Sequence, residues 1–103
     1  MIKNKFPSEL IKFTHYFNRK KYFEAHEILE PLWIQSKGKN KIFYQGLIQI
    51  SVAQHHLQNN NKIGAKNLFL KARKKLKLFP KIHLNIQHQK ILNNLEEKIK
   101  INP

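Results

Sequence analysis

Hydrophobic residues recur every three or four positions along most of this chain, which is the spacing of amphipathic helices. The pattern predicts helices over about residues 8–18, 22–36, 41–59, 62–78 and 86–100. The stretch 41–59 is apolar over more than half of its circumference, and a helix of that kind is usually buried. No stretch alternates as a β-strand does for a useful length, so the pattern indicates an all-α fold.

Several residues indicate where these helices begin, end or bend. Ser8 is expected to cap the first helix, and one of the asparagines at 59–61 is expected to cap the fourth. Gly38 is expected to end the second helix. Pro31 removes a backbone N–H inside that helix, which predicts a kink or a break. Gly46 has no side chain and would let a neighbouring helix approach the third helix closely.

The composition narrows the class of protein. The length of 103 residues suits one helical domain over residues 1–103, with residues 1–7 as a flexible lead-in. The chain has no cysteine, which excludes disulfides, thiolate metal sites and cysteine nucleophiles. Its most apolar stretch, 42–53, is broken by Gln45 and Gln49 and is shorter than the ~20 residues of a membrane span. The composition therefore predicts a soluble protein without a membrane span.

The formal charge of +14 has two open explanations. A-and-T-rich codons produce a bias towards lysine, asparagine and isoleucine whatever the protein does. A basic surface can also bind nucleic acid or an acidic protein, although the basic face of the fourth helix has no aromatic residue on which bases could stack. This basic face consists of Lys66, Lys71, Arg73, Lys74, Lys75 and Lys77.

Polar residues gather in two of the predicted helices. Three of the six acidic residues, Glu24, Glu27 and Glu30, fall within seven positions of one another. At about 100° per residue, His26 and Glu30 fall in the middle of the apolar face of the second helix. Groups buried there need polar partners. The third helix offers a stripe of such partners, namely Gln45, Gln49 and His56.

This polar cluster, defined by six residues, has two open interpretations. It forms a structural hydrogen-bond network or a small-ligand site, or it binds a divalent metal. In the metal interpretation, His26, Glu30 and His56 supply the imidazole and carboxylate ligands that suit zinc, manganese or iron. Glu27 would then be the candidate base of a metal-dependent hydrolase. The polar cluster consists of His26, Glu27, Glu30, Gln45, Gln49 and His56.

Two motifs give the chain a family resemblance. They are E-A-H-E-x-L-E-x-x-W at residues 24–33 and Q-G-L-I-Q at residues 45–49, followed by a G-A pair at residues 64–65. On these residues the chain resembles a small all-helical family of uncharacterised proteins from bacteria and some plastids. It departs from the family pattern at Lys20, where the family usually has glycine.

The resemblance implies a bundle of five or six helices, packed orthogonally with the others wrapped around one central apolar helix. Residues 41–59 fit that central position. The family is catalogued as a domain of unknown function, so the resemblance implies a fold and a site but no activity, substrate or partner. It also implies a location in the cytoplasm or the plastid stroma.

Overall fold

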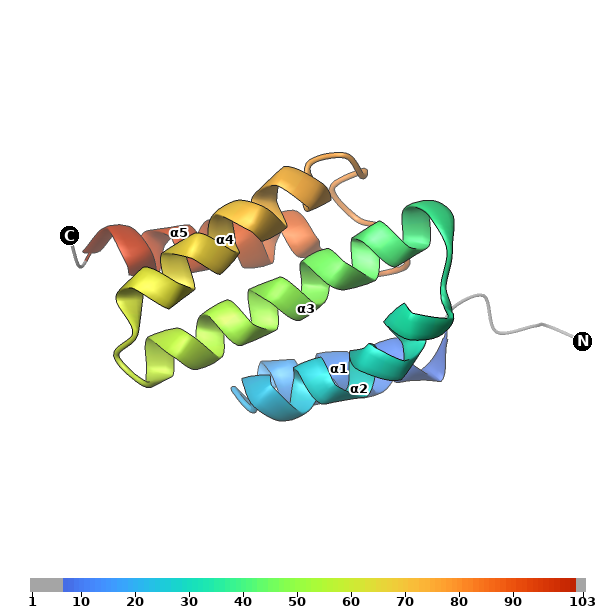
Figure 1. Cartoon of the computed structure of the whole chain (residues 1–103), viewed down its shortest axis with the longest axis horizontal. Coiled ribbons are helices and arrows are strands. Elements are labelled where there is room, and N and C mark those ends of the chain that lie inside the picture. The colour runs from blue at the N-terminus through green and yellow to red at the C-terminus, as the bar shows by residue number, and fades with distance from the viewer. Residues whose placement is uncertain (1–6, 102–103) are drawn as a thin grey trace, which may run out of the picture.

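A computed structural model describes residues 7–101 and arranges them as a bundle of five helices (Figure 1). Residues 1–6 of the expected lead-in lie outside the described part. The fold has no strand within residues 7–101; a single bridge joins His83 and Ile86 in the loop before the last helix. The helices are α1 (Ser8–Asn18), α2 (Tyr22–Gln35), α3 (Gly38–Gln58), α4 (Lys62–Leu76) and α5 (His88–Ile101).

The longest helix, α3, is the centre of the bundle. Its contacts with α4 and α2 are the most extensive in the fold, and it also contacts α5. Figure 1 shows α1 and α2 along one side of α3, and α4 and α5 along the other. Phe43, Leu47, Ile50 and Ala53 of α3 are all buried. The predicted all-α bundle around a central apolar helix is confirmed.

The sequence predicts the cap of α4 correctly, whereas the cap of α1 and the start of α3 differ from the prediction. The Asn61 side chain accepts a hydrogen bond from the Gly64 N–H at 2.9 Å, which confirms an asparagine cap on α4. Ser8 is not a side-chain cap, because it is already the first helical residue and Pro7 holds the cap position. Gly38 begins α3 instead of ending α2, with φ at 66°. The first turn of α3 is polar and exposed, so hydrophobic spacing could not reveal it.

Two short features shape the connections. Pro31 lies inside α2 without breaking it, because the helix continues to Gln35. Lys20, in the turn between α1 and α2, has φ at 63°, a left-handed backbone that favours glycine. The family resemblance leads one to expect glycine at this position. Here the turn has the left-handed backbone with a lysine in it.

The loop between α4 and α5 is held by an aromatic cluster. The Phe43 ring lies 4.6 Å from the His83 ring and 5.1 Å from the Phe79 ring, between ring centres. His88 is fully buried beside Phe43, and its Nε2 donates to the carbonyl oxygen of Pro80. The loop is therefore fixed to the N-terminal part of the central helix, α3. Among the described residues, no helix is both long and apolar enough to cross a membrane.

Candidate functional site

The polar cluster predicted on α2 contains one close pair. His26 Nε2 lies 3.7 Å from a carboxylate oxygen of Glu30, one turn along the helix. His26 Nδ1 donates to the carbonyl oxygen of Phe23 at 2.6 Å. Because Nδ1 carries that proton, Nε2 can donate to Glu30 only when the imidazole is charged. The pair is thus a local feature of α2.

Burial places this pair at the edge of the core and not in the middle of it. The side chain of His26 is 13% exposed and that of Glu30 is 51% exposed. The buried face of α2 is formed by Tyr22, Ala25 and Leu29. A helical wheel gives the width of an apolar face but not the direction of the neighbouring helix, and here the core lies on the side of Ala25.

The other cluster residues do not connect to this pair. Glu27 is exposed, Gln45 is half-buried, and the Gln49 amide oxygen is buried without a hydrogen-bond partner among the described residues. The ring of His56 accepts from Asn61 at 3.3 Å, at the far end of α3. Within residues 7–101, the six residues therefore do not form one hydrogen-bond network.

The candidate metal ligands are also apart. Among the described residues, no three histidine or acidic side chains gather closely enough to hold a metal ion. His26 and Glu30 form a pair without His56, whose ring faces the end of α3. No such group of ligands lies beside Glu27 among the described residues.

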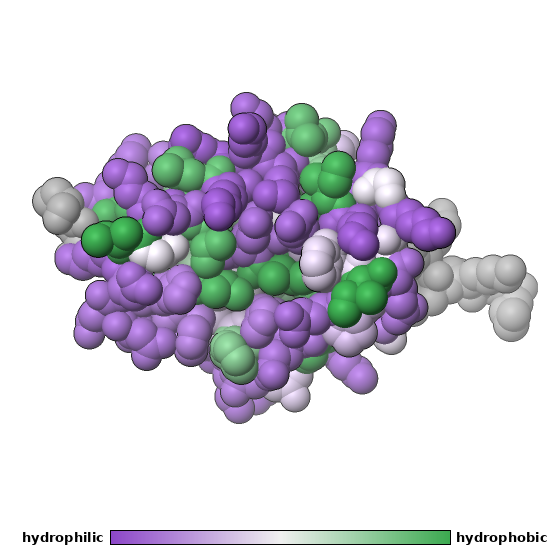
Figure 2. Space-filling model, in the orientation of Figure 1, coloured by the Kyte–Doolittle hydropathy of each residue, from purple (hydrophilic) through white to green (hydrophobic). Residues whose placement is uncertain are grey.

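The basic face of α4 is largely exposed. Arg73 reaches across to α5, where it lies 3.5 Å from a carboxylate oxygen of Glu96. Burial, followed by the charges of Lys71 and Lys74, lowers the pKa of Lys75. Figure 2 shows hydrophilic residues over most of the visible face of the molecule, with hydrophobic residues in small groups between them. A solvated lysine-rich face of this kind is common and does not by itself define a site.

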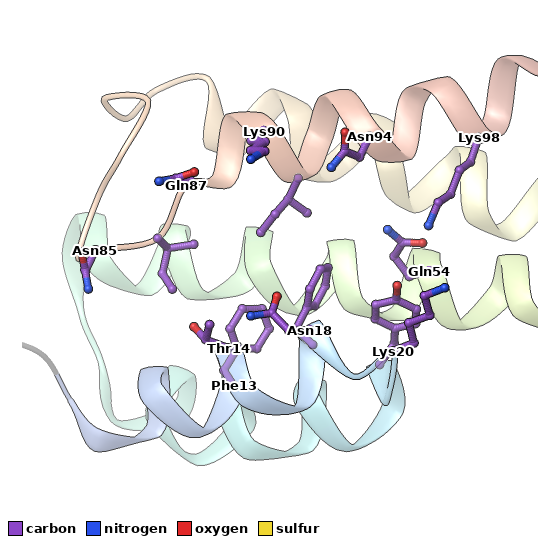
Figure 3. A pocket seen from close by; sticks show the side chains of 14 residues that line it. Phe13, Thr14, Asn18, Lys20, Gln54, Asn85, Gln87, Lys90, Asn94 and Lys98 are labelled. Atoms are coloured by element: carbon purple, nitrogen blue, oxygen red, sulfur yellow. The ribbon is translucent and has the colours of Figure 1, made fainter.

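A groove lies between α1 and α5 (Figure 3). It has a volume of about 470 Å³ and is floored by Gln54 of α3 and Tyr22 of α2. Figure 3 shows Asn18 of α1 facing Asn94 of α5 across it, and Lys20, Gln54 and Lys98 together towards one end. Its full lining is Phe13, Thr14, Phe17, Asn18, Lys20, Tyr22, Gln54, Asn85, Ile86, Gln87, Lys90, Ile91, Asn94 and Lys98.

Two polar side chains on the groove floor are almost buried and lack partners. Gln54 is 4% exposed and Tyr22 is 5% exposed. Neither side chain has a protein hydrogen-bond partner within residues 7–101, and both line the groove. Burial raises the pKa of the Tyr22 phenol, which therefore stays a neutral donor. Their polar atoms are accessible from the groove, so water or a ligand there can hydrogen-bond to them.

The sequence held one signal of this floor. Gln54 continues the spacing of Phe43, Leu47 and Ile50, the residues that form the buried stripe of α3. A glutamine in line with such residues indicates a buried amide. The predicted polar stripe with Gln45 and Gln49 lies on the opposite side of the same helix. Lys20, Lys90 and Lys98 carried no signal, because lysines occur throughout the chain.

A family model described as "Domain of unknown function (DUF309)" matches residues 10–68. A conserved hypothetical protein from Thermus thermophilus has a similar structure, with a TM-score of 0.80 and 20% sequence identity. That likeness covers 97% of this chain and 99% of the other, and it concerns the fold.

Two bacterial proteins are similar in sequence. The uncharacterised protein YpuF of Bacillus subtilis (strain 168) is 46% identical over 48 residues, which are 46% of this chain and 28% of YpuF. An uncharacterised protein of Aquifex aeolicus (strain VF5) is 34% identical over 67 residues, which are 63% of this chain and 20% of that protein. The matched part of this chain thus spans less than a third of the length of either relative.

Proposed function

This chain belongs to the family described as a domain of unknown function (DUF309), and since that description names no activity, we propose from the groove that the protein binds a small ligand between α1 and α5. One observation carries the proposal. The Gln54 side chain is nearly buried, has no protein hydrogen-bond partner among the described residues and lines the groove, where its amide stays accessible. A ligand in the groove would replace water as the hydrogen-bond partner of this amide.

The size of the groove favours a small molecule over a partner helix. Ligand pockets usually have volumes of roughly 300–1,000 Å³, and this groove has about 470 Å³. A helix with its side chains is about 10 Å across, so two turns of helix would need about twice that volume. The groove also has apolar and polar walls together, which is the usual lining of a small-ligand site.

The other hypotheses from the sequence are not adopted as the function. The His26–Glu30 contact is a local pair at the edge of the core, and we assign it a structural role. The basic face of α4 has no geometric feature that selects a partner. A location in the cytoplasm or the plastid stroma stays a prediction from the resemblance.

A fluorescent apolar probe tests the proposal. Phenylnaphthylamine, which is uncharged, would be titrated into the protein and into a Thr14→Trp variant. Thr14 is exposed and lines the groove, so an indole there would fill the groove without disturbing the core. Lys12→Trp is the matched control, because Lys12 is exposed on the same helix and does not line the groove.

The expected result is saturable binding that Thr14→Trp weakens at least about ten-fold and Lys12→Trp leaves unchanged. Saturable binding that Thr14→Trp does not weaken would place the ligand elsewhere and contradict the proposal. So would an absence of saturable binding. Near- and far-UV circular dichroism of both variants would establish that each keeps the native fold.

A further inference from the structure

We infer, resting on the proposed function, that the ligand of the α1–α5 groove is an organic anion with an apolar body. Its carboxylate or phosphate group would lie at the end that holds Lys20, Gln54 and Lys98 (Figure 3). Its apolar body would lie against Phe13 and Ile91. The inference rests on the charge of the lining, on its hydrogen-bond donors and on its apolar wall.

The charged residues of the lining are all positive. Lys20, Lys90 and Lys98 line the groove, and none of the six acidic residues of the chain does. The remaining polar lining consists of amides and hydroxyls. A groove walled by low-dielectric protein and lined by one sign of charge attracts a ligand of the opposite sign. A cationic ligand would find no carboxylate in the lining to pair with.

The floor adds fixed donors to this charge. The Tyr22 hydroxyl stays protonated because burial raises the pKa of its phenol, and the Gln54 amide offers an N–H₂ group. The backbone of Lys20 is held beside them, since Gln58 Nε2 donates to the Lys20 carbonyl oxygen at 3.0 Å. Hydrogen-bond donors and ammonium groups that line the same part of a groove favour carboxylate or phosphate oxygens there.

The apolar wall excludes a bare inorganic anion as the whole ligand. Phe13 and Ile86 are buried, and Phe17 and Ile91 pack against the core beside them. An ion alone would leave the exposed parts of the half-buried Phe17 and Ile91 in water. An apolar body placed over the wall would be removed from water at the same time as its anionic group meets the lysines, which adds to the affinity.

A pair of dyes that differ in one anionic group tests this inference. Anilinonaphthalene sulfonate carries a sulfonate, and phenylnaphthylamine has the same rings without it. Both would be titrated into the protein, into Lys20→Gln and into Lys98→Gln. Lys12→Gln is the matched control at an exposed lysine outside the groove.

We expect the sulfonate to bind at least about five-fold more tightly than the uncharged dye. Lys20→Gln and Lys98→Gln would each weaken the sulfonate by about three- to ten-fold and change the uncharged dye by less than about two-fold. Lys12→Gln would change neither dye. Displacement of the sulfonate by benzoate or by phenyl phosphate would then identify carboxylate or phosphate as the preferred group.

The outcomes separate the two proposals. If the uncharged dye binds in the groove but the sulfonate gains nothing from the lysines, the ligand is not an anion and the small-ligand function stands. The anion inference also fails, and the small-ligand function stands, if neither benzoate nor phenyl phosphate displaces the sulfonate. If Thr14→Trp affects neither dye, the groove is not the site and both proposals fail.

Discussion

Gly46 of α3 lies directly against Leu76 of α4. A Cβ atom added to Gly46 would lie 2.8 Å from both Cδ2 and Cγ of Leu76, which is closer than real Cβ atoms come to a neighbour. Leu76 is fully buried and cannot turn away into solvent. The sequence-based prediction that Gly46 allows a close helix contact is confirmed, and the partner is α4.

Gly46→Ala is therefore expected to destabilise the protein by about 1–2 kcal/mol, because overpacking outweighs the better helix propensity of alanine. In a Leu76→Ala background, the same change should instead stabilise by about 1 kcal/mol, since the obstruction is gone. Urea denaturation of the four proteins in this double-mutant cycle measures the difference. Equal effects in both backgrounds would show that the two residues are not coupled.

Gln54→Leu is expected to stabilise the fold and weaken ligand binding together. Leucine has a similar size, and it removes a nearly buried amide that has no protein partner within the described chain. The gain should be about 1 kcal/mol in urea denaturation. Gln58→Leu serves as the comparison, because Gln58 is hydrogen-bonded to Lys20 and should lose about 0.5–1.5 kcal/mol. A loss of stability in Gln54→Leu would mean that the amide has a partner in solution.

Lys20→Gly should relieve strain in the turn between α1 and α2. A side chain at φ 63° is unfavourable, and glycine removes that cost. The expected gain is about 0.5–1 kcal/mol by thermal or urea denaturation. Lys21→Gly is the control, since its φ of −91° is ordinary and glycine there only adds freedom to the unfolded chain. An equal loss of stability in both variants would contradict the inference that the backbone at Lys20 is strained.

His83 is expected to make the fold less stable in mild acid. Burial, and then the neighbouring His88, lower the pKa of His83, so the unfolded chain takes up this proton more readily than the folded one. The stability that neutral His83 contributes to the fold is fully present above the pKa of about 6.5 of the unfolded chain. It is lost as the pH falls through the lower pKa of His83 in the folded protein.

Thermal denaturation from about pH 7 to about pH 5 checks this, because a His83→Gln variant should show a shallower fall in Tm than the parent. No carboxylate of the described residues forms an ion pair with the His83 ring, whose Nε2 donates to the Asn40 side chain at 3.3 Å. Glutamine can keep that hydrogen bond and does not titrate. Parallel curves for the two proteins would show that another group carries the pH dependence.

Much of the fold was predictable because it depends on local spacing. The central position of α3 follows from apolar residues all round it, and the cap at Asn61 follows from its side-chain chemistry. The start of α3 at Gly38 was missed, since a polar exposed turn has no hydrophobic periodicity. The family resemblance agreed with the periodicity on the helical bundle.

The site was less predictable because it depends on contacts between helices distant in sequence. His26 and Glu30 share a face of α2, but the wheel did not tell which face meets α3. The groove needs α1 beside α5, and no local pattern reports that arrangement. Gln54 was the one visible trace of it, as a polar residue in the stripe of Phe43 and Leu47.

The order of the helices along α3 also bears on how the chain folds. The extensive contacts join neighbours in sequence, from α1 with α2 through to α4 with α5. Such a low contact order predicts folding in microseconds to milliseconds. The first and last helices meet only across the groove, so that side should form late and open early. A ligand bound to both walls would link α1 to α5 and slow that opening.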